Sequence, residues 1–264
     1  MQTVKAQQVI DYIFEMAPNP DWGTENIFEY GDGTREVTGI GVAWWITSEM
    51  LQDFAAKNYS LGLTHERIIY DMPQDYVWGK VIKTEELGTN RRIKELVTRH
   101  DIAIHRFHSN IDLVEWGMPR ALFGQLGWND CPVDWSRGVP VVEIAPVSLE
   151  TLIATVKSKL QLPFVRYDGD LSRIIRRVAV PWGGLGQWWT GVACAAPLGF
   201  DAMIGGDIID GVVRLAREEG WAVIDAMHHA TELEAMKRLA ERVQQRFPDM
   251  PVEYYENSMP WAVL

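Results

Sequence analysis

Two separate stretches of the chain, 37–112 and 177–232, carry the same order of secondary-structure signals. In each, an apolar strand precedes a helix, a second strand that ends in polar residues, a second helix, and a third strand followed by a His-x-x-x-acid sequence. Strands that alternate with helices form a mostly parallel sheet with helices on both faces. The repeat is too long for a solenoid, so the pattern predicts a three-layer α/β fold of two related halves, a duplication.

The positions of the elements follow from the apolar runs and from residues that begin and end helices. The strands are expected at 37–45, 60–63, 101–104, 177–181, 200–204 and 221–224. The helices are expected at 4–16, 47–57, 91–99, 148–160, 187–196, 208–218 and 231–247, with a loop at 19–36. A stretch with several Pro and Gly residues favours a connection near the middle of the chain. The prediction is a first half at 1–130, a connecting segment at 131–170 and a second half at 171–264.

The composition is that of a globular protein with a substantial core. Hydrophobic residues make up 47% and charged residues 23% of the chain, which argues against disorder. No apolar run approaches the roughly 18 residues that cross a bilayer, and the N-terminus lacks the apolar region of a signal peptide. These observations predict a cytoplasmic protein without a membrane span. The two cysteines, Cys131 and Cys194, indicate no disulfide framework and are interpreted as buried thiols.

The formal net charge of −11 argues against a nucleic-acid partner, because binding the phosphate backbone requires a basic face. The densest basic group, at 173–177, is interpreted as solvated surface. Twelve tryptophans are present, some of them in the pairs Trp44-Trp45 and Trp188-Trp189. Large aromatic side chains are enriched in cores and interfaces, so the tryptophans predict core and subunit contacts, with a pocket lining as the alternative.

Three polar clusters follow strands of the predicted sheets, where ligands collect in open α/β folds. The clusters are His65-Glu66, residues 108–112 with a histidine and an aspartate at their ends, and residues 228–232 with a histidine and a glutamate. Imidazole and carboxylate together suit Zn, Mn, Fe, Ni or Co. A pair of ions about 3.5–4 Å apart needs a bridging carboxylate, for which Asp112 and Glu232 are available. If the halves pack about a pseudo-twofold axis, the clusters converge on two divalent metal ions.

The local geometry imposes one condition on this site. Adjacent side chains on a regular strand point to opposite faces, so His65 and Glu66 share a site only where the strand breaks into a turn. A single His-x-x-x-acid sequence is commonly a surface pair. Two of them at matching places, together with His65-Glu66, favour a metal site.

Other motifs favour structural interpretations. Residues 183–186, Gly-Gly-Leu-Gly, follow a strand and could cradle phosphate, but they lack the Lys-Ser/Thr of a P-loop. A tight turn is therefore the favoured interpretation. His100 and His105 have no acidic residue at useful spacing and are interpreted as structural.

The motifs of the three clusters resemble those of one family. Residues 64–66 resemble a Thr-His-His strand end, 108–112 a His-Thr-Asn-Leu-Asp motif, and 225–232 an Asp-x-Gly-His-x-x-Ser-Glu motif. The Gly-Gly-Asp sequence at 205–207 stands where that family has Thr-Gly-Asp. The chain thus resembles the Nif-three-like family of dinuclear-metal-centre hexameric proteins, often labelled GTP cyclohydrolase type 2 homologues.

The resemblance implies two related α/β halves with a metal site between them and a toroidal homo-hexamer, a trimer of dimers. It implies that two divalent metal ions are held by five ligands, His65, Glu66, Asp112, His228 and Glu232. His108 would then lie in the second shell and orient Asp112.

Three departures from the family pattern affect this site. Glu66 replaces a histidine, which favours a harder metal such as Mn or Mg there, or leaves one metal weak or absent. Met227 replaces a glycine just before His228, which puts the tightness of that turn in question. His229 is an additional imidazole that could compete for the metal from the second shell.

Two functions fit such a centre. A metal-dependent hydrolase would use a metal-bound water, with Glu66 as a possible acid or base, on a small molecule or nucleotide in cyclohydrolase-like or phosphoesterase-like chemistry. The alternative is a non-catalytic hexameric scaffold in which the metals stabilise a ring that binds a protein partner.

Overall fold

A computed structural model describes the chain except residues 1–2, 22–24, 71–75, 78–79 and 82–86. The chain forms two compact units. The first contains 1–114 and 236–257, and the second contains 115–235 and 258–264. Among the described helices, none has the length and apolar character needed to cross a membrane.

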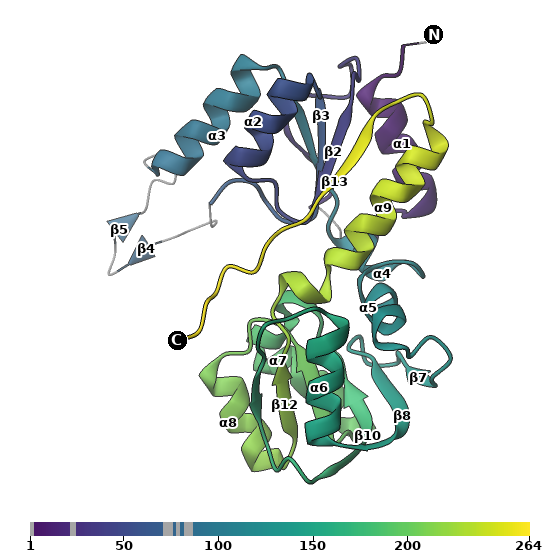
Figure 1. The fold of residues 1–264 in the computed structure, drawn as a ribbon, viewed down its shortest axis with the longest axis vertical. Helices are drawn as coiled ribbons and strands as arrows, with labels where there is room; N and C mark the ends of the chain where they lie inside the picture. The colour runs from purple at the N-terminus through teal and green to yellow at the C-terminus, as the bar shows by residue number, and fades with distance from the viewer. Residues whose placement is uncertain (1–2, 22–24, 71–75, 78–79, 82–86) are drawn as a thin grey trace. The chain divides into compact units, whose positions relative to one another are not determined.

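The first unit is built on a five-stranded sheet in the order β1-β6-β3-β2-β13. Its parallel strands are β2 (Ile40–Ala43), β3 (Leu61–Thr64), β6 (Ala103–Arg106) and β13 (Val252–Tyr255), and β1 (Phe28–Tyr30) pairs antiparallel with β6. Helices α2 (Ser48–Lys57) and α3 (Gly88–Arg99) lie on one side of the sheet, and α1 (Ala6–Met16) and α9 (Leu233–Arg246) on the other (Figure 1). The short helix α4 (Ser109–Leu113) follows β6, and β4 (Tyr76–Val77) pairs with β5 (Lys80–Val81).

The central strands of this sheet are buried along their whole length, as expected for parallel strands covered by helices on both faces. Helix α2 begins where the Thr47 hydroxyl accepts a hydrogen bond from the amide of Met50, and it ends at Asn58 in a left-handed conformation. Phe54 of α2 and Ile104 of β6 belong to the core beneath α2 and α3.

The second unit is built on a six-stranded sheet in the order β7-β8-β10-β11-β12-β9. Strands β10 (Ile174–Ala179), β11 (Ala202–Gly205) and β12 (Ala222–Asp225) are parallel, whereas β7 (Val133–Asp134), β8 (Val141–Ser148) and β9 (Arg166–Asp168) pair antiparallel. One face carries α5 (Met118–Leu126) and α6 (Leu149–Lys159), and the other carries α7 (Trp189–Ala195) and α8 (Asp210–Glu219). Short 3-10 helices lie at Gly183–Gln187 (η2), Ala196–Leu198 (η3) and His229–Thr231 (η4).

The two units share one order of elements, which confirms the predicted duplication. The first unit runs α1-β1-β2-α2-β3-α3-β6, and the second runs α6-β9-β10-α7-β11-α8-β12. In both, the antiparallel edge strand pairs with the last parallel strand, β1 with β6 and β9 with β12. Each unit therefore has three equivalent parallel strands. The polar clusters follow β3 and β6 in the first unit and β12 in the second.

The units divide the chain at other places than the predicted boundaries of 130 and 170. Residues 131–170 carry β7, β8, α6 and β9 of the second sheet, and the C-terminal strand β13 joins the first sheet beside β2. Of these elements, β7, β9 and β13 are edge strands and β8 is buried only at its start, so none of these strands gives a long apolar run. The expected loop at 19–36 likewise contains β1. Both cysteines are free, but Cys131 is only partly buried and Cys194 is exposed, so their interpretation as buried thiols was wrong.

Candidate metal centre

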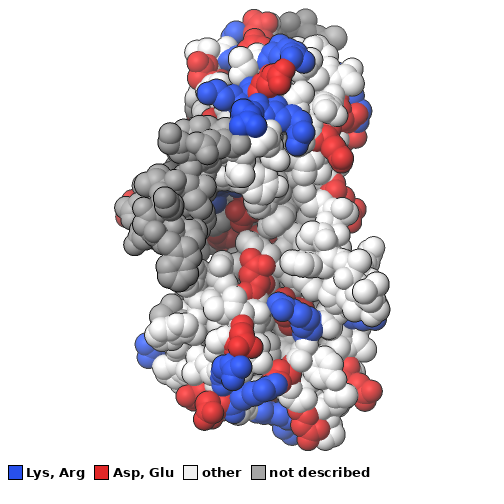
Figure 2. All heavy atoms as spheres, turned by 90° about the vertical axis from the view of Figure 1, so that its left-hand side faces the viewer, with Lys and Arg blue, Asp and Glu red and all other residues white. Residues whose placement is uncertain are grey.

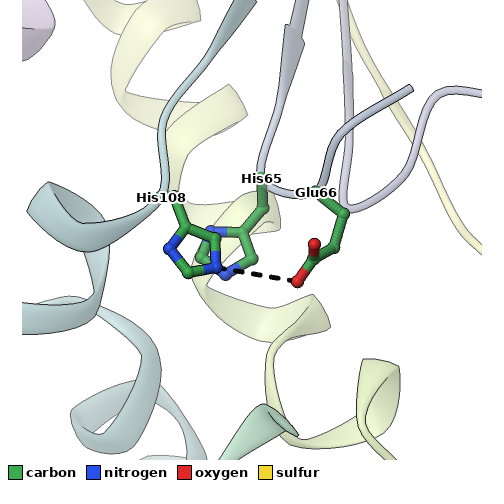
Figure 3. A group of neighbouring side chains, drawn as sticks. All are labelled: His65, Glu66 and His108. Atoms are coloured by element: carbon green, nitrogen blue, oxygen red, sulfur yellow. Dashed lines mark ion pairs between the residues drawn. The ribbon is translucent and has the colours of Figure 1, made fainter. Parts of the chain in front are cut away.

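The turn after β3 brings His65 and Glu66 to one side of the sheet. The strand ends at Thr64, and the carbonyl oxygen of Trp44 accepts hydrogen bonds from the amides of His65 (3.1 Å) and Glu66 (2.8 Å). The Thr64 hydroxyl donates to the same oxygen over 3.2 Å. These bonds break the strand alternation, which is the condition that a shared site required. Figure 3 shows both side chains directed toward His108.

The ring of His65 is held in one orientation by the backbone. The side chain is fully buried, and its Nδ1 lies 3.0 Å from the carbonyl oxygen of Phe107. In the neutral ring Nδ1 must then carry the proton, because a carbonyl oxygen only accepts hydrogen bonds. The lone pair available to a metal is consequently on Nε2.

His108 stacks on His65 and is surrounded by carboxylates. The two ring centroids are 4.4 Å apart at an interplanar angle of 16°. His108 Nε2 lies 3.7 Å from Glu66 Oε1, and its Nδ1 lies 3.3 Å from Glu25 Oε2 and 3.7 Å from Asp112 Oδ2. Burial lowers the pKa of His108, but Glu66 and Asp112 outweigh it, and the net shift is upward.

These side chains form a group that fits a divalent cation. One ligand atom each from His65, Glu66 and His108 lies within 4.8 Å of the others. An ion with ligands at about 2.1 Å holds its donor atoms about 3–4 Å apart, so small side-chain rotations would close the group around one ion. His108 lies close enough to be counted in this group, and its predicted place in the second shell stays a prediction. We refer to His65, Glu66, His108 and Asp112 as the first-unit group.

Arg106 supplies a positive charge beside this group, and the sequence reasoning missed it. Its Nε donates to the carbonyl oxygen of His65 over 3.0 Å, and its Nη2 lies 3.9 Å from Glu66 Oε2. The side chain is 11% exposed. A buried guanidinium at this distance offsets part of the charge that Glu66 brings to the position of a family histidine.

In the second unit, the turn after β12 brings His228 and Glu232 together. His228 Nε2 lies 3.2 Å from Glu232 Oε2, because η4 winds the intervening residues into one tight turn. On the other side of the ring, His228 Nδ1 lies 2.8 Å from Asp207 Oδ2. A carboxylate on one ring nitrogen orients a histidine and leaves the other nitrogen for a metal. We refer to His228, Glu232 and Asp207 as the second-unit group.

Met227 keeps the tight turn that the family builds with glycine. Its φ is +68°, and its amide donates to Asp225 Oδ1 over 3.0 Å. A left-handed conformation costs a residue other than glycine about 1–2 kcal/mol. The Met227 side chain is 7% exposed and packs in the core, and burying such a side chain contributes about 1.5–3 kcal/mol. The burial therefore offsets the strain, and the departure leaves the turn intact.

Gly183 makes room for the second-unit group. It has φ +55°, its amide donates to the Thr231 hydroxyl over 2.8 Å, and a Cβ atom on it would lie 1.8 Å from Glu232 Oε1. The glycine-rich stretch is thus a tight turn, as the favoured interpretation expected, and it packs directly against the predicted ligands.

His229 is buried, which lowers its pKa, and the neighbouring His228 lowers it further. It is absent from the groups of described residues that could hold an ion. His105 is enclosed by the rings of Phe14, Phe28 and Phe107, and burial lowers its pKa to about 4. Its interpretation as a structural residue agrees with this environment.

Comparison with known proteins identifies the family. The family model described as Duf34/NIF3 (NGG1p interacting factor 3) matches residues 1–260. The chain belongs to the DUF34/NIF3 family. A relative named GTP cyclohydrolase 1 type 2 homolog from Clostridium perfringens is 30% identical over 261 residues, which cover 95% of both chains.

Two solved structures share the fold of this chain. A Bacillus cereus protein related to NIF3 superposes with a TM-score of 0.80 at 14% identity, and the match covers all of both chains. A Staphylococcus aureus protein, SA1388, superposes with a TM-score of 0.77 at 20% identity, again over all of both chains. The NIF3 match includes the residues of both the first-unit and the second-unit groups.

Two residues of this NIF3-family site escaped the sequence reasoning for different reasons. Asp207 carried a signal, because it ends a Gly-Gly-Asp sequence directly after β11, in the place of a family motif. Arg106 carried none, because an arginine at the end of a buried strand resembles any surface residue until its partners are known.

Proposed function

We propose that this NIF3-family protein is a metal-dependent hydrolase with a centre for two divalent ions. Its ligands would be His65, Glu66 and Asp112 from the first-unit group and His228 and Glu232 from the second-unit group. One observation carries the proposal. In each group a protein oxygen accepts from Nδ1 of the key histidine, Phe107 for His65 and Asp207 for His228, which directs Nε2 to a metal.

The donor set narrows the choice of metal. It contains two imidazoles and three carboxylates, and such mixed sets suit Zn, Mn, Fe, Ni or Co. Glu66 adds an oxygen donor, which favours a harder ion such as Mn at its position. Arg106 reduces the net negative charge at this position, which lowers its electrostatic affinity for any cation.

The residues of the centre suit hydrolysis. Bound divalent ions would supply Lewis acidity and an activated water. Glu66 can accept a proton at Oε1, 3.7 Å from His108 Nε2. Burial lowers the pKa of His108, but Glu66 and Asp112 raise it above its ordinary value, which favours this imidazole as a proton donor to a leaving group. The names of the relatives favour a cyclohydrolase-like reaction on a small molecule or nucleotide, and phosphoester hydrolysis is the alternative.

We further propose that the protein works in the cytoplasm as a toroidal homo-hexamer, a trimer of dimers. Trp188 and Trp189 are 59% and 57% exposed. Large exposed aromatic side chains suit an interface between subunits or with a protein partner, and this observation also favours the scaffold alternative. The distribution of charge gives no support for a nucleic-acid partner. On the face that Figure 2 shows, Lys and Arg side chains form small groups interrupted by Asp and Glu.

Metal content per subunit tests the proposal. Mass spectrometry of untagged protein should give close to two ions per chain, and the variant His228→Ala should lose at least one of them. His100→Ala is the matched control, because His100 is exposed at the end of α3 and should leave the content unchanged. A metal content near zero in the wild type would contradict the proposed centre.

Activity separates the hydrolase from the scaffold. Metal-loaded protein should turn over at least one substrate among nucleotides and generic phosphoesters, and His228→Ala should abolish this turnover. Full metal content without turnover of any substrate, or turnover unchanged in His228→Ala, would favour the scaffold.

A further inference from the structure

The edge strand β9 places Arg166 directly opposite the end of β12. In the antiparallel pairing of these strands, Arg166 is the partner of Asp225. Its guanidinium forms a short hydrogen-bonded ion pair with Asp225 Oδ2, and the same nitrogen, Nη2, donates to the carbonyl oxygen of Ile208 over 3.1 Å. Arg166 therefore binds two turns that are separate in sequence.

The first of these turns precedes His228. The Asp225 side chain is 3% exposed, and its Oδ1 accepts the amide of Met227 over 3.0 Å. A buried carboxylate is costly unless it is paired and hydrogen-bonded. Arg166 supplies the charge that keeps the Asp225 carboxylate at this position, and the carboxylate in turn holds the Met227 turn.

The second turn carries Asp207, the residue that orients His228. Ile208 is the next residue along the chain, so a bond to its carbonyl oxygen restrains the backbone that carries the Asp207 carboxylate. Asp207 and Met227 both have positive φ, +52° and +68°. Residues in this conformation persist only where the surrounding structure holds them, and Arg166 contacts both turns.

We propose that Arg166 is a positioning residue for the second-unit group. It touches neither His228 nor Glu232 in the contacts described. It acts by fixing the Met227 turn, through Asp225, and the Asp207 turn, through Ile208. Together these set the direction of His228 Nε2. The inference rests on the proposed function where it concerns metal binding, and on the apoprotein alone where it concerns the two turns.

A second arginine beside β9 provides a matched control. Arg217 of α8 pairs with Asp168 of the same strand, with Nε at 3.0 and 3.1 Å from the two carboxylate oxygens. The two arginine side chains are similarly exposed, 66% for Arg217 and 62% for Arg166, although Asp168 (20%) is less buried than Asp225 (3%). Asp168 touches neither the Asp207 turn nor the Met227 turn in the described contacts. Arg217→Ala therefore removes the same charge and size without releasing either turn.

Competition with a chromophoric chelator for Mn²⁺ or Zn²⁺ measures the effect on metal binding. Arg166→Ala should lower the affinity for the more weakly bound ion about tenfold or more, the range found when outer partners of a metal-bound histidine are removed. Arg217→Ala should stay within twofold of the wild type. Arg166→Lys should recover part of the loss, because an ammonium keeps the ion pair with Asp225 but lacks the planar fork. Wild-type affinity in Arg166→Ala would overturn the inference.

Amide hydrogen exchange of the metal-free protein tests the turns independently of any metal. The Met227 amide should exchange at least tenfold faster in Arg166→Ala than in the wild type, with no change in Arg217→Ala and comparable melting temperatures. Unchanged exchange would overturn the inference even if metal binding were weaker. If the wild type binds no metal, the proposed function fails, and the exchange result alone decides the role of Arg166.

Discussion

At the scale of single residues, the site is defined by which nitrogen of each histidine is held by the protein. His65 and His228 lie 163 residues apart in the chain, yet each has its Nδ1 against a protein oxygen. His105 shows the contrasting case. It lies on the same strand that leads to the first-unit group, but aromatic rings enclose it, and its pKa falls to about 4.

The pKa of His105 predicts a stability change with pH. The folded pKa lies below the ordinary value of 6.5, so the unfolded chain takes up a proton that folded His105 resists. This contribution is fully present above pH 6.5 and is lost as the pH falls toward 4. A shift of this size corresponds to about 3 kcal/mol in the free energy of unfolding.

Urea unfolding at pH 7 and pH 4.5 measures this contribution. The variant His105→Asn should lose less stability between the two values than the wild type, because asparagine does not titrate. His100→Ala, which removes an exposed histidine, should behave as the wild type does. An identical pH dependence in His105→Asn and wild type would contradict the assignment.

At the scale of elements, both groups depend on turns at the ends of parallel strands rather than on the strands themselves. Trp44 closes the turn after β3 with one carbonyl oxygen, and Asp225 closes the turn after β12 with one carboxylate oxygen. The turn at Gly183 follows β10, and it packs against Glu232. A change in such a turn should therefore affect metal binding more than folding.

Gly183→Ala tests this expectation. The new methyl group would collide with the Glu232 carboxylate, the movable end of a side chain, so the carboxylate should shift while the fold persists. The left-handed φ adds about 1–2 kcal/mol of strain. We expect a loss of at least one metal ion per chain with a small decrease in melting temperature. Gly211→Ala in α8, where a Cβ meets nothing within 4 Å, is the control. Full metal content in Gly183→Ala would show that Glu232 is not a ligand.

At the scale of the whole molecule, metal binding is coupled to folding. Ions that bind only the folded protein stabilise it by mass action, by about 2.7 kcal/mol when the free ion is at 100 times its dissociation constant. Metal binding and stability should therefore be linked, whichever reaction the centre performs.

Chelation tests this linkage. Treatment with EDTA should lower the melting temperature of the wild type, and His228→Ala, already deficient in metal, should respond less. Native mass spectrometry before and after chelation would report the assembly, which we expect at six times the 30.1 kDa chain. A melting temperature and a mass that are both insensitive to chelation would contradict a stabilising role for the metals.

The sequence by itself determined the alternation of strands and helices, the duplication and the family. It did so because these depend on local apolar periodicity and on short motifs that follow strand ends. The predicted strand at 60–63 and the observed β3, Leu61–Thr64, differ by one residue. The sequence also showed histidines and carboxylates after three strands. Because the carboxyl ends of parallel strands share one edge of a sheet, these residues could be expected to form a site.

Only the tertiary structure decided which side chains hold these residues in place. The contacts of Trp44 with the turn after β3, of Asp207 with His228, and of Arg166 with Asp225 join positions about 20 to 60 residues apart. The pairing of β13 with β2 spans nearly the whole chain. Such contacts leave no local pattern, because each partner alone is an ordinary residue at the end of a strand. They become specific only when the sheets bring the partners together.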